Sequence, residues 1–204
     1  MEIKLHHGDL PDDVKIGDSV AIDSETLGLI PRRDRLCLVQ LTFGDGITHL
    51  VKFDGYKYNA PNLSRILADD KILKIFHYAR FDIAVLYYYL NTMCTSVYCT
   101  KIASKLTRTY TDRHGLKNLV HEMLSVDMSK QQQSSDWGAN VLTQAQMDYA
   151  ASDVIHLHIL KIKLDKRLDR EGRWDIAREC FKFLPTRAIL DLNGWGETDI
   201  FSHS

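Results

Sequence analysis

The feature that most constrains this chain is an apolar run that ends in two carboxylates. Residues 20–26 read Val-Ala-Ile-Asp-Ser-Glu-Thr, so Asp23 and Glu25 are separated by a single residue. Because side chains alternate along a β-strand, both carboxylates project from the same face, with room for a hard cation between them. Taken alone, the pair has two interpretations, a metal-binding strand or a solvated strand end. The choice depends on whether further acids occur at matching places downstream.

Further acids do occur downstream. Asp82 follows an apolar segment and lies in or near the first turn of the next expected helix. Tyr149 and Asp153 are four residues apart, so they share one face of a later helix. Four carboxylates without histidine or cysteine partners suit hard divalent ions such as Mg²⁺ or Mn²⁺, which prefer oxygen ligands. Two such ions would stabilise the attacking and the leaving oxygen of a displacement at phosphorus, so the set predicts nuclease chemistry.

The order of elements predicts an α/β domain with a mixed central sheet flanked by helices. The turn at residues 44–46 (Gly-Asp-Gly) joins two strands of an opening antiparallel meander. A capping box from Thr143 to Gln146 begins a helix that is expected to run past Leu160. Its sheet-facing strip is expected to be Met147, Ala150, Val154, Leu157 and Ile159. Strands are expected at 19–25, 36–43, 47–53 and 72–76, further helices at 61–67, 83–90, 97–106 and 116–124, and polar turns over 1–18.

Length and charge set the frame for any substrate. With 204 residues the chain is expected to form one domain, with a core of about residues 19–165. A formal net charge of −1 provides no global positive field, so a nucleic acid must be held locally by metal ions and a few basic side chains. The four cysteines lack zinc-like or scaffold spacing, which favours a reducing compartment, by default the cytoplasm. No apolar run is long enough to suggest a membrane partner.

Three blocks of the sequence together resemble the exonuclease motifs of the DEDD superfamily. They are residues 22–26 (Ile-Asp-Ser-Glu-Thr), 77–82 (His-Tyr-Ala-Arg-Phe-Asp) and 149–154 (Tyr-Ala-Ala-Ser-Asp-Val). Tyrosine in the third block, with aspartate at position 148, is similar to the tyrosine-bearing branch that contains ribonuclease D. The resemblance implies a DnaQ-like, ribonuclease H-like fold, 3′-to-5′ exonuclease activity and dependence on two divalent ions.

Ribonuclease D carries helical domains after its nuclease domain, and this chain ends too soon for them. Its organisation therefore resembles nano-RNase C, a short bacterial form of the family. That resemblance implies hydrolysis of short RNA oligonucleotides, down to dinucleotides, to nucleoside 5′-monophosphates, and assembly into an octameric ring. Processing of longer RNA, or of DNA ends, is the alternative enzyme interpretation. A catalytically dead nucleic-acid-binding scaffold is the non-enzyme interpretation, and the intact set of acids argues against it.

The resemblance also assigns roles to individual residues. Asp23, Glu25, Asp82 and Asp153 would bind the metal ions, with Asp23 as the bridge, and Tyr149 would orient the attacking water. Leu27 is expected either to wedge between bases or to cover the core. His77 is expected either to contact the 3′-terminal sugar or to be a strand-end histidine with its hydrogen bonds satisfied within the protein. Trp137 is expected either to stack on a base or to anchor a loop. The expected substrate contacts are Ser24, Thr26, Leu27, His77, Phe81 and Trp137.

Two further groups of residues keep open interpretations. Arg108, Arg113 and Lys117 either grip phosphates or form solvated surface. The tail, from about residue 181 to residue 204, is rich in large apolar groups for a terminal segment. We therefore expect Trp174, Phe181, Phe183, Leu184, Trp195 and Phe201 to pack against the domain or against a neighbouring subunit.

Overall fold

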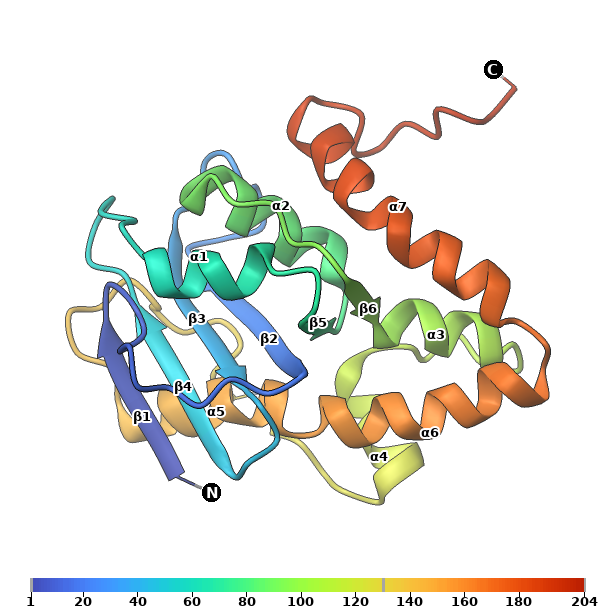
Figure 1. The fold of residues 1–204 in the computed structure, drawn as a ribbon, viewed down its shortest axis with the longest axis horizontal. Helices are drawn as coiled ribbons and strands as arrows, with labels where there is room; N and C mark the ends of the chain where they lie inside the picture. The colour runs from blue at the N-terminus through green and yellow to red at the C-terminus, as the bar shows by residue number, and fades with distance from the viewer. Residues whose placement is uncertain (1, 130, 204) are drawn as a thin grey trace.

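Within residues 2–129 and 131–203, which the computed structural model describes, six strands form one mixed sheet in the order β1-β4-β3-β2-β5-β6 (Figure 1). β2, β3 and β4 form the expected antiparallel meander, while β1, β5 and β6 each pair in parallel with a neighbour. The expected mixed α/β architecture is therefore confirmed. The strands are β1 Glu2–His7, β2 Ser19–Thr26, β3 Leu36–Thr42, β4 Ile47–Lys52, β5 Leu73–Phe76 and β6 Val97–Cys99.

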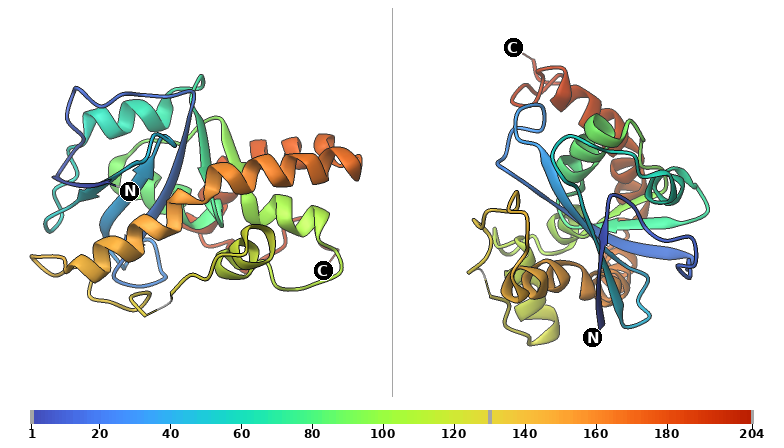
Figure 2. Two further views of the ribbon diagram at one scale, coloured as in Figure 1. Left: turned by 90° about the horizontal axis from the view of Figure 1, so that it is seen from below. Right: turned by 90° about the vertical axis from the view of Figure 1, so that its left-hand side faces the viewer.

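Helices cover both faces of this sheet (Figure 2, right). α5 packs across β2, β3 and β4 on one face, above a small apolar cluster that includes Leu38, Leu50 and Trp137. α2 packs against β2 and β5 on the other face, where the main hydrophobic core lies. The helices are α1 Pro61–Ala68, α2 Ala79–Leu90, α3 Thr100–Thr107, α4 Leu116–Leu124, α5 Gln144–Ile155, α6 Leu157–Arg170 and α7 Trp174–Leu192.

Two strands differ from the expectation. Residues 2–7 form β1, although the segment was expected to be polar turns, because the strand is a largely exposed edge with only Ile3 and Leu5 as apolar signal. Residues 97–99 form β6 rather than the start of a helix, since they pair with β5 before α3 begins at Thr100. Both errors concern short strands that tertiary pairing selects, and local pattern is weak for such strands.

The helix that starts at the Thr143 capping box is interrupted at His156. The capping box itself forms as expected, with the Thr143 and Gln146 side chains each bonding the other's backbone. α5 packs on the sheet, whereas α6 packs mainly on α3 and α4. The expected sheet-facing strip is therefore wrong at its last residue: Leu157 is buried, but Ile159 is 47% exposed.

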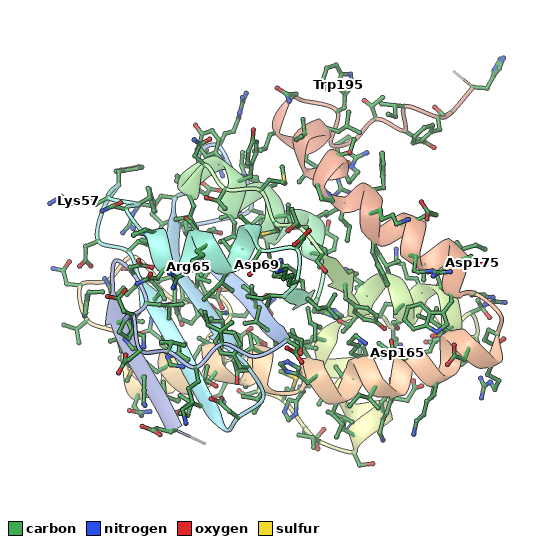
Figure 3. The ribbon with its side chains drawn as sticks, in the orientation of Figure 1. Lys57, Arg65, Asp69, Asp165, Asp175 and Trp195 are labelled. Atoms are coloured by element: carbon green, nitrogen blue, oxygen red, sulfur yellow. The ribbon has the colours of Figure 1, made fainter. Side chains whose placement is uncertain are left out.

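The C-terminal part forms the long helix α7, which the sequence pattern did not reveal. Phe181 and Leu184 are buried against the domain, and the Phe181 ring lies 4.6 Å from the Tyr98 ring. Beyond the helix, Trp195 is 47% exposed and points away from the sheet, and Phe201 is 77% exposed (Figure 3). The helix therefore packs against the domain, whereas the last apolar groups have largely exposed surfaces.

All four cysteines, Cys37, Cys94, Cys99 and Cys180, are unpaired. Among the described helices, none is both long enough and apolar enough to cross a lipid bilayer.

Candidate active site

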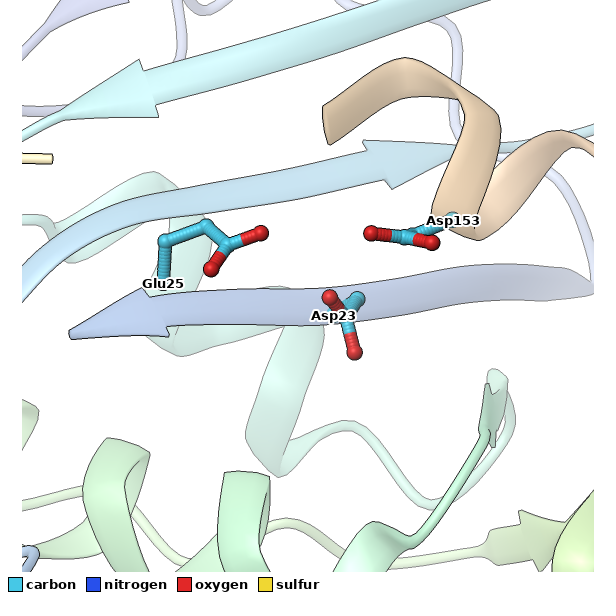
Figure 4. A group of neighbouring side chains, drawn as sticks. All are labelled: Asp23, Glu25 and Asp153. Carbon is cyan, nitrogen blue, oxygen red and sulfur yellow. The ribbon is translucent and has the colours of Figure 1, made fainter. Parts of the chain in front are cut away.

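The two acids of the first block leave β2 on the face that α5 covers. Asp153 projects from α5 toward them, and Figure 4 shows the three carboxylates turned toward a common point. One oxygen from each of Asp23, Glu25 and Asp153 lies within 4.8 Å of the others. Strand alternation thus aligns the first two acids, and the helix packing brings the third to them.

Asp82 reaches the site from the opposite side of β2. It occupies the first turn of α2, is 3% exposed, and its Oδ1 accepts a hydrogen bond of 2.7 Å from the Ser24 hydroxyl. Ser24 was expected to bind substrate. The structure instead turns its side chain away from Asp23 and Glu25, because it is the intervening residue of the strand, and gives its hydroxyl to Asp82.

The electrostatic environment of the four acids is unfavourable to charge. Burial raises the pKa of Asp23 and of Glu25 well above the usual range, and the charges of Asp82 and Asp153 raise both further. Burial also raises the pKa of Asp82 and of Asp153 to about 7, although hydrogen bonds from Ser24 and Tyr149 oppose the rise. Among the described residues, no cationic side chain lowers the pKa of these four acids, and a bound divalent ion would offset their charge.

Tyr149 lies one helical turn before Asp153 on α5 and bonds to its carboxylate. Burial and the neighbouring Asp153 and Glu25 charges raise the pKa of the Tyr149 hydroxyl far above neutrality. The phenol is therefore protonated at physiological pH and acts as a hydrogen-bond donor rather than as a base.

The three grouped acids and Tyr149 line a cavity of about 310 Å³. His77 lies in its wall, with Nδ1 2.9 Å from the Thr100 hydroxyl and with Nε2 buried and without a partner among the described residues. Burial, followed by the Lys101 charge, lowers the pKa of His77 to about 3, so the ring is neutral. The lining residues are Asp23, Glu25, His77, Lys101, Gly115, Leu116, Lys117, Asn118, Met128, Ser129, Gln133, Tyr149 and Asp153.

Four other expected substrate contacts lie outside this lining. The Thr26 hydroxyl bonds the Gly28 carbonyl, and the Leu27 backbone N–H donates to the Arg35 carbonyl, although the Leu27 side chain is 51% exposed. Phe81 lines a separate cavity with Leu29 and Ile30. Trp137 is 2% exposed, with its ring centroid 6.0 Å from that of Tyr149. Its burial favours the loop anchor over the base-stacking alternative, because neither ring face is open to a base.

The basic residues divide differently from the expectation. Arg108 is 1% exposed and ion-paired with Glu122, so it is buried structure rather than a charge offered to a phosphate or solvated surface. Lys117 lines the cavity. Lys101, which the sequence analysis did not single out, also lines it and places its Nζ 4.1 Å from the Tyr78 ring centroid. No periodic or motif signal marks Lys101, since it lies in the first turn of a short helix.

The donor set fits a hard divalent cation. All three closely grouped ligands are carboxylate oxygens, which Mg²⁺ and Mn²⁺ accept, and no thiol or imidazole belongs to the group within the described residues. Asp82 does not belong to this trio, although its charge raises the pKa of Asp23.

Comparison with known proteins agrees with the fold and the donor set. Residues 8–169 match the model of a 3′-5′ exonuclease family, which is most of the chain. The chain therefore belongs to the DnaQ-like 3′-5′ exonucleases, in the branch that holds ribonuclease D and NrnC.

Among curated relatives, ribonuclease D of Gluconacetobacter diazotrophicus is 34% identical over 156 residues, which are 76% of this chain but only 39% of that protein. The chain thus spans well under half of the ribonuclease D sequence it matches. Solved structures of Brucella melitensis NrnC cover 100% of both chains. The form with bound Mg²⁺ is 57% identical with a TM-score of 0.95, and the form bound to pGG is 58% identical with a TM-score of 0.96.

The raised acid pKa values make the stability of the metal-free protein depend on pH. Carboxyls whose folded-state pKa is raised hold protons that the unfolded chain has lost, so their contribution to the free energy of unfolding falls as pH rises from about 4 through about 7. Asp153→Asn should therefore stabilise the protein in EDTA more at pH 8 than at pH 5, by roughly 1 to 3 kcal/mol. Urea denaturation measures this difference. Asp148→Asn, an exposed change on the same helix, is the control, and an equal effect of Asp153→Asn at both pH values would contradict the electrostatic account.

Proposed function

We propose that this protein is a metal-dependent 3′-5′ exoribonuclease that degrades short RNA oligonucleotides, down to dinucleotides, to nucleoside 5′-monophosphates. The observation that carries the proposal is the convergence of Asp23, Glu25 and Asp153 within 4.8 Å, beside Tyr149, in one cavity. Such a group is costly for the fold, since each acid raises the energy of ionising the others. A divalent ion bound between the acids would offset this repulsion and could bind a phosphodiester, which accounts for the presence of the group.

Each acid has a role in this proposal. Asp23, Glu25 and Asp153 would hold one ion, and Asp23 with Asp82 would hold a second. Two ions, Mg²⁺ or Mn²⁺, supply a water of lowered pKa and stabilise charge on the oxygens that exchange at phosphorus. The Tyr149 hydroxyl, anchored beside Asp153, orients the attacking water, and His77 offers its unpaired Nε2 to a hydroxyl of the 3′-terminal sugar.

Preference for short RNA rests on the shape and charge of the cavity. A space of about 310 Å³ suits a small part of a nucleic acid, and Lys101 and Lys117 are the cations in its lining. With a formal net charge of −1, the chain offers little attraction to long polyanions. The structure of Brucella NrnC bound to pGG supports a similar ligand here.

We also infer a cytoplasmic homo-oligomer, which the resemblance implies to be an octameric ring. Exposed apolar groups such as Leu29 and Phe201 support subunit contacts.

A length series of RNA tests the proposed substrate. In Mg²⁺, 5′-labelled RNAs of two to about seven nucleotides should be shortened from the 3′ end much faster than an RNA of about twenty nucleotides or a matched DNA. The reason is that a small cavity with few cations grips a long chain weakly. Labelled products are resolved by gel electrophoresis, with Asp153→Ala and EDTA as blanks. Equal rates on long RNA or DNA would contradict the short-RNA specificity and favour a ribonuclease D-like or DNA-directed activity.

Tyr149→Phe separates water orientation from metal binding. Loss of the hydroxyl should lower kcat on a dinucleotide by about 10²- to 10³-fold, the range for loss of one preorganised hydrogen-bond donor. Mn²⁺ affinity should change little, because the four carboxylates remain. Single-turnover kinetics and calorimetric titration with Mn²⁺ measure the two effects. An unchanged kcat would remove Tyr149 from the mechanism.

A further inference from the structure

Gln40 is a polar side chain buried in the middle of a mostly apolar strand. All seven residues of β3 are buried, and Gln40 has no exposed surface. In the antiparallel register it lies directly opposite Asp23, so its side chain is on the same face of the sheet as Asp23 and Glu25. Gln40 therefore approaches the acids of β2 from the neighbouring strand β3.

The Gln40 amide is the donor to Asp23. Its Nε2 lies 2.7 Å from Asp23 Oδ2, and no other side chain within residues 2–129 and 131–203 bonds to the Asp23 carboxylate. The same side chain lowers the pKa of the neighbouring Glu25 against the effect of burial. The amide thus holds Asp23 and lies on the same face of the sheet as Glu25.

The orientation of this amide has a cost in the fold. Gln40 Oε1 is buried and has no hydrogen-bond partner among the described residues. The reversed orientation would place Oε1 against the carboxylate oxygens, which are also acceptors. The acids therefore determine the direction of the amide, and a satisfied structural glutamine would not leave its oxygen unpaired.

We propose that Gln40 is a positioning residue for the metal centre, which holds the Asp23 carboxylate, beside Glu25, in the orientation that binds a divalent ion. A neutral donor suits this role better than a cation would. Lysine or arginine in its place would pair with the acids and compete with the metal ion, whereas an amide fixes their oxygens and leaves their charge available. This inference rests on the proposed function, because it assumes that the acids bind metal.

The test is Mn²⁺ binding to the full-length protein without RNA, measured by isothermal titration calorimetry at pH 8. Gln40→Met keeps the size of the side chain and removes both donors. It should weaken Mn²⁺ binding by about 10- to 100-fold, as loss of a group that supports metal ligands typically does. Its stability in EDTA should not fall, since methionine suits an apolar surrounding. The matched control is Thr42→Val, a change on the same face of β3. It removes a buried hydroxyl that donates to the Ile47 carbonyl and not to an acid. Thr42→Val should bind Mn²⁺ as the wild type does.

Each outcome has a defined meaning. A folded Gln40→Met that binds Mn²⁺ with wild-type affinity overturns the role of Gln40 and leaves the proposed function intact. Failure of the wild-type protein to bind Mn²⁺ overturns the proposed function itself. If Gln40→Met does not fold, Gln40→Asn replaces it, because asparagine keeps the polarity but withdraws the amide from the carboxylates. Wild-type affinity in Gln40→Asn would then overturn the inference.

Discussion

The mutual repulsion of four buried carboxylates is the constraint on which the rest of this structure depends. Burial raises the cost of ionising Asp23, Glu25, Asp82 and Asp153, and the charges of neighbouring acids raise it further for Asp23, Glu25 and Asp82. A fold keeps such a group together only if stronger packing elsewhere holds its elements in place. The buried apolar residues of β2 and β3, with a core on each face of the sheet, supply that packing.

The strand β2 organises the site through its alternation. Its even and odd residues face different helices, so Asp23 and Glu25 meet Asp153 on α5 while Ser24 meets Asp82 on α2. A single short segment therefore joins the acids of both layers. Neutral donors from Ser24 and Gln40 hold two of these carboxylates without cancelling their charge, which leaves the group suited to a cation from outside.

The sequence predicted those parts of the site that depend on local spacing. Alternation aligns Asp23 with Glu25, and helical spacing aligns Tyr149 with Asp153; both follow from backbone geometry alone. The meander and the Thr143 capping box followed from turn and cap chemistry, and the structure confirms them. Gln40 and Lys101 reach the site only through the packing of separate elements, so no local pattern marked them. The edge strand β1 and the turn at His156 escaped prediction for the same reason.

The most direct test of this account is to locate the metal in crystals of the protein soaked with Mn²⁺, using anomalous scattering. The account predicts a strong peak among the carboxylates of Asp23, Glu25 and Asp153, and a second peak between Asp23 and Asp82 when a short RNA is bound to an inactive variant. The peak among Asp23, Glu25 and Asp153 should be absent from crystals of Asp153→Ala. Full occupancy by Mn²⁺ elsewhere on the protein, with no peak among these acids, would contradict the claim that the carboxylate group exists to hold a divalent ion.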